Sequence, residues 1–274
     1  MRFRLPIILG ILNITEDSFS DGGRFLTPEA ALAQARKLLK DGAKVLDLGA
    51  AASNPKAKPV APADEIARLA PVLKALQAEK IAVSIDSFSP EVQHWALVQQ
   101  AAYLNDIHGF PESPLYAELA VSRAKLIVMH AAQEYGRATA LDIPVDGLFE
   151  QILVFFAERI AALERGGIDR SRLILDPGMG MFLSTRAEAS FEVLRRLPEL
   201  KEAFGLPVLV SLSRKSFLRK LVDRSVAEAG PATLAGELFA VFQGADYIRT
   251  HDPAALADAV AVWTAALTGN TSPS

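Results

Sequence analysis

Short apolar runs recur along the chain, and each is followed by a stretch that carries helix start signals. The runs are rich in Val, Ile and Leu and are nearly continuous, with few polar interruptions. Continuous apolar runs of this length are typical of parallel strands that are buried on both faces. The predicted strands are residues 7–12, 45–48, 81–85, 102–104, 126–129, 173–175, 208–210 and 247–248.

The stretches between these runs predict helices with recognisable first and last residues. A capping residue precedes a proline at Thr27-Pro28, Ser89-Pro90 and Asp252-Pro253, and Ala61-Pro62 reads similarly. Proline fits the first turn of a helix, where its missing N–H group costs nothing. Glycines close several of the helical stretches, at Gly42, Gly166, Gly205 and Gly244.

Eight strand–helix units in 274 residues predict an α/β fold, the (β/α)8 barrel, with its active site at the C-terminal ends of the strands. No composition break, linker or repeat interrupts the chain, so we expect one domain over residues 1–274. An open, doubly wound sheet is the alternative. Such a sheet would use a glycine-rich phosphate loop, and Gly178-Met179-Gly180 lacks the third glycine of that loop.

Composition narrows the class of protein further. Half of the residues are hydrophobic and 22% are charged, which excludes a disordered chain. The net charge of −3 offers no basic footprint, so we expect neither nucleic acid nor a membrane as a partner. The chain has no cysteine, which excludes thiolate chemistry and fits a cytoplasmic protein. The apolar run 7–12 is short and Asn13 follows it, so it predicts no secretory signal.

Polar residues collect directly after the predicted strands, which in a barrel meet at the mouth where active sites are built. Asp86, Asn105 and Asp176 follow the third, fourth and sixth strands. Carboxylates accept hydrogen bonds and an amide both donates and accepts, so the three fit a heterocycle with several N–H donors, such as a pterin. A single Asp after a strand is more often a turn or capping residue, and we keep that interpretation for Asp47 and Asp106.

A second polar group predicts an anion site. Arg249 and His251 occupy alternate positions after the last strand, so their side chains point the same way. Together with the segment 213–216 they predict a phosphate site, and the alternative is a surface ion pair of Arg249 with Asp252. The acidic turn 16–21 lacks the spacing of a calcium loop, so we expect magnesium held through substrate phosphates.

These motifs, taken together, resemble those of the dihydropteroate synthases. Residues 10–23, which read Gly-Ile-Leu-Asn-Ile-Thr-Glu-Asp-Ser-Phe-Ser-Asp-Gly-Gly, match the opening signature of that family. Its later signatures match, in the family's order, residues 84–87, 105–107, 128–130, 175–178, 213–217 and 249–251. The resemblance implies a barrel, working as a homodimer, that condenses a dihydropterin-methyl diphosphate with 4-aminobenzoate and releases diphosphate.

The resemblance also implies roles for individual residues. The pterin would be held by Asp86, Asn105, Asp176 and Lys215. The diphosphate would be held by Asn13, Arg249 and His251, with Mg²⁺ bridging Asn13 and phosphate oxygens. The aminobenzoate would be bordered by Ser53, Pro55 and Ser216, and the remaining substrate contacts are Met129, Met181 and Phe182. The expected catalytic residues are Asp86, Asp176, Lys215, Arg249 and His251.

Two loops depart from the common pattern of the family. Residues 51–55 read Ala-Ala-Ser-Asn-Pro where Glu-Ser-Thr-Arg-Pro is usual, so Asn54 replaces an arginine. Residues 180–184 read Gly-Met-Phe-Leu-Ser. Both loops resemble the sulfonamide-insensitive branch carried on mobile resistance elements, which has an aromatic residue where Met181 stands. The resemblance to that branch implies sulfonamide resistance.

A second hypothesis is a pterin-binding barrel without condensation activity, similar to the folate-binding module of methyl-transfer proteins. The two hypotheses differ in the use of Lys215, Arg249 and His251. A module that binds no diphosphate has no need for this cationic cluster, so the cluster favours condensation.

Overall fold

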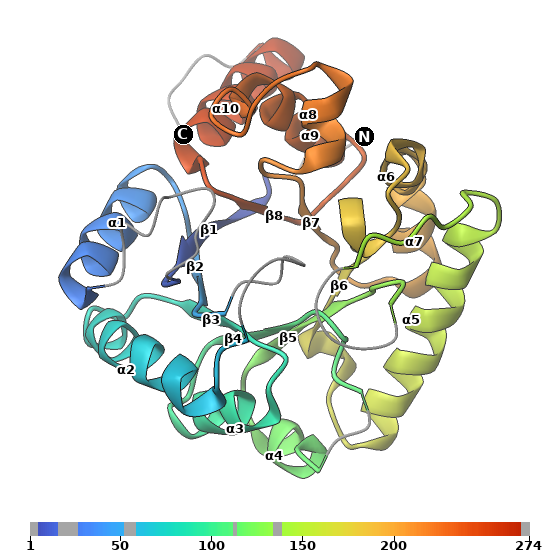
Figure 1. Ribbon diagram of the computed structural model, residues 1–274. Helices are drawn as coiled ribbons and strands as arrows, with labels where there is room; N and C mark the ends of the chain where they lie inside the picture. Colours follow the sequence, from blue (N-terminus) through green and yellow to red (C-terminus); the bar gives the residue numbers. More distant parts are fainter. Residues whose placement is uncertain (1–4, 16–26, 52–58, 112–113, 134–138, 270–274) are drawn as a thin grey trace.

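Parallel strands form a closed barrel at the centre of the molecule (Figure 1). The computed structural model describes residues 5–15, 27–51, 59–111, 114–133 and 139–269. Hydrogen-bonded neighbours run in the order β6-β5-β4-β3-β2-β1-β8-β7, and a parallel bridge between Leu175 and Val208 joins the last strand to the first. The strands are β1 (Ile7–Asn13), β2 (Val45–Gly49), β3 (Val83–Asp86), β4 (Tyr103–Asp106), β5 (Lys125–Met129), β6 (Leu173–Asp176), β7 (Leu209–Ser211) and β8 (Tyr247–Thr250).

Helices alternate with the strands and surround the barrel (Figure 1). The closed ring and this alternation confirm the predicted (β/α)8 barrel and rule out the open sheet. The α-helices are α1 (Pro28–Lys40), α2 (Pro62–Ala78), α3 (Pro90–Val98), α4 (Tyr116–Val121), α5 (Leu148–Arg165), α6 (Ala187–Arg195), α7 (Leu197–Phe204), α8 (Ser216–Leu221), α9 (Gly230–Phe242) and α10 (Pro253–Thr268). Two short 3-10 turns, η1 (Arg170–Arg172) and η2 (Gly180–Phe182), flank β6.

Local sequence signals account for most of these boundaries. Helices α1, α3 and α10 begin at the predicted prolines, and the side chains of Thr27, Ser89 and Asp252 each accept a backbone N–H of the first turn. Such caps satisfy donors that the helix itself cannot pair, and each contributes about 1 kcal/mol. Helix α7 ends at Gly205 in the left-handed conformation, as predicted.

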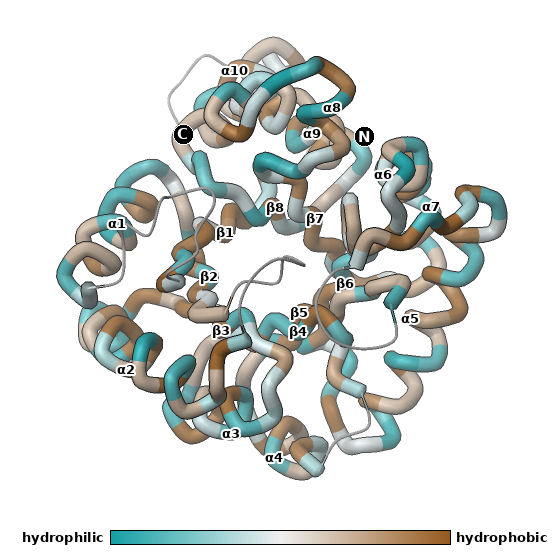
Figure 2. Tube along the Cα trace, viewed as in Figure 1, coloured by the Kyte–Doolittle hydropathy of each residue, from teal (hydrophilic) through white to brown (hydrophobic). Residues whose placement is uncertain are grey.

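The two faces of the strands divide the core. Outward-facing strand residues and the inner sides of the helices form the main apolar cluster, which includes Leu12, Leu46 and Leu104. Figure 2 shows hydrophobic residues recurring along the central strands, while the helices alternate between hydrophobic and hydrophilic positions. Near the N-terminal ends of the strands, the barrel interior is filled by Leu9, Val45, Tyr103, Ile127, Ile174, Leu209 and Tyr247.

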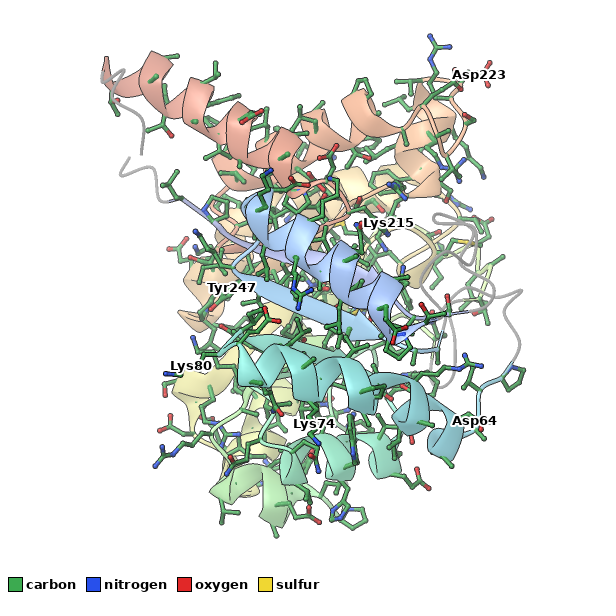
Figure 3. All side chains as sticks on the ribbon, turned by 90° about the vertical axis from the view of Figure 1, so that its left-hand side faces the viewer. Asp64, Lys74, Lys80, Lys215, Asp223 and Tyr247 are labelled. Atoms are coloured by element: carbon green, nitrogen blue, oxygen red, sulfur yellow. The ribbon has the colours of Figure 1, made fainter. Side chains whose placement is uncertain are left out.

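Polar residues take over at the other end of the barrel interior. On β2 the inward side changes from Val45 to Asp47, two residues further on, because alternate residues share a face. Figure 3 shows the two ends: Tyr247 lies towards the left, and Lys215, which follows β7, lies to its right. The interior is therefore apolar at the start of the strands and charged at their C-terminal ends.

Among the described residues, no helix combines the length and the apolarity needed to cross a bilayer. The expected single domain over residues 1–274 stays a prediction.

Candidate active site

The C-terminal ends of the strands bring together most of the residues that the sequence predicts. Strand register places Asp86 beside Asn105 and Met129 beside Asp176. Arg249 on β8 lies opposite Ser211 on β7. Ser211 comes four residues before Lys215 in the chain. Residues far apart in the chain, such as Asp86 and Arg249, which are 163 positions apart, therefore line one mouth.

The guanidinium of Arg249 ties three strands together inside the barrel. Its Nε donates to Oδ2 of Asp47 on β2 at 2.5 Å, and its Nη2 donates to Oδ2 of Asp86 on β3 at 2.7 Å. Burial alone would lower the pKa of Arg249, but the two carboxylates raise it above its ordinary value. Arg249 is therefore a permanent cation, and both carboxylates form ion pairs with it.

The pairing with Arg249 corrects two sequence interpretations. Asp47 is not a turn or capping residue: it lies within β2, and its side chain is fully buried. The alternative surface pair of Arg249 with Asp252 is also wrong, because Asp252 caps α10. Asp106 is a turn residue, as predicted, since its carboxylate accepts the backbone N–H groups of His108 and Phe110.

Asp176 and Lys215 form the second charged part of the mouth. Burial raises the pKa of Asp176 to about 6, although the N–H of Gly178, 2.9 Å from its Oδ1, and the charge of Lys215 oppose this shift. Burial lowers the pKa of Lys215 to about 8, and Asp176 limits that decrease. Burial likewise raises the pKa of Asp86 to about 7, against the pull of Arg249. All three groups therefore change charge close to neutral pH.

A glycine shapes the loop that carries Asp176. Gly178 has a positive φ of 74°, and a Cβ atom there would stand 2.4 Å from the carbonyl oxygen of His130. Only glycine fits both conditions, so the chain turns back tightly and its N–H reaches Asp176. Burial lowers the pKa of His130 to about 4, so its ring is neutral at physiological pH. The ring packs edge-on against Phe155.

An apolar wall stands beside these charges. Ile107, Met129 and Phe182 are buried together, with Phe88 and Met181 packed against them. Lys215 Nζ lies 5.1 Å from the centre of the Phe182 ring. Asn105 reaches towards the interior, with its Nδ2 3.5 Å from Asp47, and its Oδ1 has no hydrogen-bond partner among the described residues. An apolar surface beside an unsatisfied amide oxygen and two carboxyl groups suits a heterocycle with several N–H donors.

His251 and Ser216 border the mouth beside β7 and β8. His251 donates its backbone N–H to Ser213 Oγ at 3.1 Å, and its Nδ1 lies 2.8 Å from the same oxygen. Lys215 precedes α8, and Ser216 is the first residue of that helix. The predicted anion-binding residues thus lie side by side on two adjacent strand ends.

Asn13 lies at the end of β1, opposite Gly49 of β2. A Cβ atom at Gly49 would stand 3.6 Å from Asp86 Oδ2 and 3.7 Å from Asn13 Oδ1, so both oxygens border the space that the glycine leaves. Ser53 and Pro55, and the acidic turn 16–21, lie outside the described residues.

Sequence reasoning missed three buried carboxyl groups around the mouth. Asp47 sits in the apolar run 45–48, and Glu237 sits in the apolar stretch of α9. Glu65 is in the first turn of α2, where an exposed acidic residue is usual. The available signal for Asp47 and Glu237 was a lone carboxylate inside an otherwise apolar run, which requires a buried partner.

Comparisons with known proteins identify the family to which this chain belongs. The pterin binding enzyme family matches residues 9–251. The dihydropteroate synthase type-2 of Escherichia coli is 56% identical over 93% of this chain and 94% of its own. A Xanthomonas albilineans dihydropteroate synthase solved with 4-aminobenzoic acid has a TM-score of 0.86 at 35% identity, over 97% of this chain and 94% of its own. The structure of the Xanthomonas albilineans enzyme in complex with 7,8-dihydropteroate has a TM-score of 0.82 at 34% identity, over 98% of this chain and 96% of its own.

The barrel and the charged mouth define a pterin-binding enzyme of the (β/α)8 class. More narrowly, the chain belongs to the dihydropteroate synthases, transferases of folate biosynthesis.

The ion pair of Asp47 generates a stability prediction. Asp47→Asn removes one of two anions from a buried cation, and we expect the free energy of unfolding to fall by about 3 kcal/mol. The matched control is Asp142→Asn, which breaks an exposed pair with Arg186 and should lower the free energy of unfolding far less, because exposed ion pairs contribute little. Urea denaturation at pH 7 measures both. Equal losses would show that Asp86 alone is enough to stabilise Arg249.

Proposed function

We propose that this chain condenses a dihydropterin-methyl diphosphate with 4-aminobenzoate to give 7,8-dihydropteroate and diphosphate. The observation that carries the proposal is the side-by-side placement of a carboxyl-and-amide group and a cationic group at one barrel mouth. The first suits a pterin and the second a diphosphate. Relatives solved with 4-aminobenzoic acid, one of the proposed substrates, and with 7,8-dihydropteroate, the proposed product, support this reaction.

The pterin half of the site consists of Asp86, Asn105, Asp176 and Lys215. The carboxyl groups are desolvated, so N–H donors on a bound ring would form strong, charge-assisted hydrogen bonds with them. The free Oδ1 of Asn105 supplies one more acceptor. The wall of Met129 and Phe182 would cover the ring face.

The anion half consists of Arg249, His251 and the residues that follow β7. Arg249 uses two of its five N–H groups on Asp47 and Asp86, which leaves others for phosphate oxygens. His251 is held by Ser213 and can add a donor. Diphosphate leaves more easily when cations neutralise the charge that develops on it, so the anion half would stabilise the departing diphosphate.

Magnesium is the metal that we propose for this half. The described residues hold no cluster of three or more His, Cys, Asp or Glu that could bind a metal. Mg²⁺ fits this donor set, since it keeps several waters and takes its other ligands from one or two side chains and substrate phosphates. Asn13 Oδ1 would hold the ion, whose charge would stabilise the departing diphosphate.

In the reaction the arylamine nitrogen bonds to the pterin methylene carbon, the carbon–oxygen bond to diphosphate breaks, and the nitrogen loses a proton. Positive charge develops on the methylene carbon as the diphosphate leaves. Asp86 and Asp176, ionised when the ring binds, lie where they can stabilise that charge. The proposal therefore requires no covalent protein intermediate.

The substitution Asp176→Asn tests the function. It keeps the shape of the site but removes a charge from the pterin half. We expect pterin affinity to fall about 30-fold, equivalent to about 2 kcal/mol, because a charge-assisted hydrogen bond in a desolvated pocket is lost. Calorimetry measures pterin binding, and diphosphate release in the presence of 4-aminobenzoate measures turnover. Asp246→Asn, whose carboxylate pairs with Lys201 before β8, is the control.

Tight pterin binding by the wild-type chain without diphosphate release would favour the non-condensing barrel instead. Unchanged pterin affinity in Asp176→Asn would remove this residue from the site.

We also propose that the chain resists sulfonamides. Its 56% identity to the type-2 enzyme, against 35% to the Xanthomonas albilineans enzyme, supports placement near the type-2 branch. Met181 lies in η2, directly after the loop of Asp176, and is packed against the apolar wall of the mouth. A bulky side chain there would clash with the substituent of a sulfonamide while leaving the smaller carboxylate of 4-aminobenzoate unobstructed.

Substitutions at Met181 test this proposal. Methionine is flexible and moves aside at modest cost, whereas a phenyl ring is stiffer. We therefore expect Met181→Phe to raise the sulfonamide inhibition constant much more than it raises the Michaelis constant of the aminobenzoate substrate. Met181→Ala should lower the sulfonamide constant. Inhibition curves for both variants supply the numbers, and equal shifts of the drug and substrate constants would mean that η2 does not discriminate.

A homodimer is the assembly that we propose, with α9 and α10 as its interface. An apolar face on these helices includes Leu234, Leu238, Val262, Trp263 and Leu267, and Val262 and Leu267 are 71% and 60% exposed. Monomers rarely expose contiguous apolar faces of this kind. A second copy of the same face would cover it symmetrically. A cytoplasmic location stays a prediction from the composition.

A charge on this face should separate the subunits. We expect Val262→Asp to halve the molar mass in light scattering, because association would bury the new carboxylate. Val121→Asp is the matched control: Val121 is 86% exposed on α4, away from this face, and its substitution should leave the mass unchanged. Val262→Asp with an unchanged dimeric mass would place the interface elsewhere.

A further inference from the structure

Two segments of the mouth share one pattern at the same spacing. Residues 86–90 read Asp-Ser-Phe-Ser-Pro, and residues 249–253 read Arg-Thr-His-Asp-Pro. Each contains a charged site residue, a hydroxyl residue, an aromatic ring, a helix-capping residue and the first proline of the next helix. The two charged residues, Asp86 and Arg249, bond to each other. One segment belongs to the pterin half and the other to the anion half.

The hydroxyl residue does the same work in both segments. Ser87 Oγ accepts the N–H of Ser89 at 3.2 Å, and Thr250 Oγ1 accepts the N–H of Asp252 at 3.2 Å. Each hydroxyl thus fixes the turn between its strand and the next helix. Its own O–H then remains as a donor.

A buried glutamate accepts that donor in each case. Ser87 bonds to Glu65, and Thr250 bonds to Glu237. Each glutamate lies on the helix that precedes the strand in question: Glu65 on α2, before β3, and Glu237 on α9, before β8. The geometry follows from strand alternation, because side chains next to the inward-pointing Asp86 and Arg249 point outward to the helices.

Neither glutamate is explained by packing alone. Glu65 is 4% exposed and Glu237 is 2% exposed, and Oε1 of each has no hydrogen-bond partner within the described part of the chain. Burial raises the pKa of both, that of Glu237 to about 8. A methionine would fill similar space without leaving a polar atom unsatisfied. A carboxyl group that is costly to bury, and that touches the turn beside a site residue, points to a functional requirement.

The surroundings of Glu237 connect it to the anion half by a second route. It lines a cavity of about 610 Å³ together with Ser213 and Asp252. Ser213 is the residue that holds His251, and Asp252 is the residue whose N–H Thr250 accepts. Glu237 therefore borders the same cavity as two residues that take part in the contacts fixing the segment from Arg249 to Asp252.

We propose that Glu65 and Glu237 are a matched pair of positioning residues, each serving one half of the site. Glu65, through Ser87, orients Asp86 for the pterin ring. Glu237, through Thr250, orients Arg249 and His251 for the diphosphate. The assignment of one half of the site to the pterin and the other to the diphosphate rests on the proposed function. The positioning role of the two glutamates is tested by ligand binding alone and does not depend on turnover.

The test compares two binding constants in two pairs of variants. Glu65→Met and Glu237→Met keep side-chain length and remove the acceptor. Glu65→Gln and Glu237→Gln keep a neutral acceptor. Calorimetry measures the Kd of a pterin without diphosphate and, separately, the Kd of inorganic diphosphate with Mg²⁺ present.

We expect a crossed result. Glu237→Met should weaken diphosphate binding about tenfold and pterin binding less than about twofold, and Glu65→Met should do the reverse, since each loses one buried hydrogen bond on its own side. Both Gln variants should stay within about twofold of the wild type, because an amide oxygen still accepts from the hydroxyl.

The proposal would be overturned if either Met variant weakened the binding of both ligands equally, or if the Gln variants did not keep the binding affinity of the wild type. If a Met variant does not fold, Ser87→Ala and Thr250→Val cut the same links from the hydroxyl side and should give the same crossed pattern. A wild-type chain that binds both ligands but makes no dihydropteroate would refute the proposed condensation and leave this test intact.

Discussion

One buried cation organises the mouth of this barrel. The guanidinium of Arg249 lies inside the ring of strands, where an unpaired charge would be very costly, so it requires anions at fixed positions. Asp47 and Asp86 supply them from two other strands. The arrangement works only if β8, β1, β2 and β3 keep their register, because a slip by one residue would turn these side chains outwards. The ion pair therefore couples the geometry of the site to the closure of the barrel.

Local sequence signals were sufficient for the architecture. The apolar runs located the strands to within two residues at each end, and Thr27, Ser89 and Asp252 cap helices as predicted. These features depend on residues within one turn or one strand. The predicted site residues Asp86, Asn105, Asp176 and Arg249 are also gathered at one mouth, because the strand ends of a barrel must converge.

What the sequence could not predict is which polar residues pair with each other. Asp47 and Arg249 are 202 positions apart, and nothing local distinguishes Asp47 from a capping aspartate. Glu65 and Glu237 lie on helices. Their hydroxyl partners come 22 and 13 positions later: Ser87 follows β3, and Thr250 is the last residue of β8. Such pairings follow from the packing of helix against strand, which periodicity does not reveal. The roles implied for Ser53 and Pro55 stay predictions, since both lie outside the described residues.

The same burial that builds the site also weakens the ligand-free protein. Asp86 and Asp176 have pKa values of about 7 and about 6, above those of unfolded chains, so the folded state holds their protons more tightly. Stability is therefore lost as the pH rises from about 4 through these values, where the two carboxyl groups become charged while buried. Lys215, with its pKa lowered from 10.5 to about 8, costs stability fully below pH 8, and this cost disappears as the pH rises towards 10.5. At neutral pH the mouth thus holds several charges that are largely withdrawn from solvent, with 17% of the Arg249 side chain and 23% of the Asp86 side chain exposed. A ring with N–H donors would hydrogen-bond to the carboxylates and a diphosphate would pair with the cations, so each ligand would offset part of the cost of burying these charges.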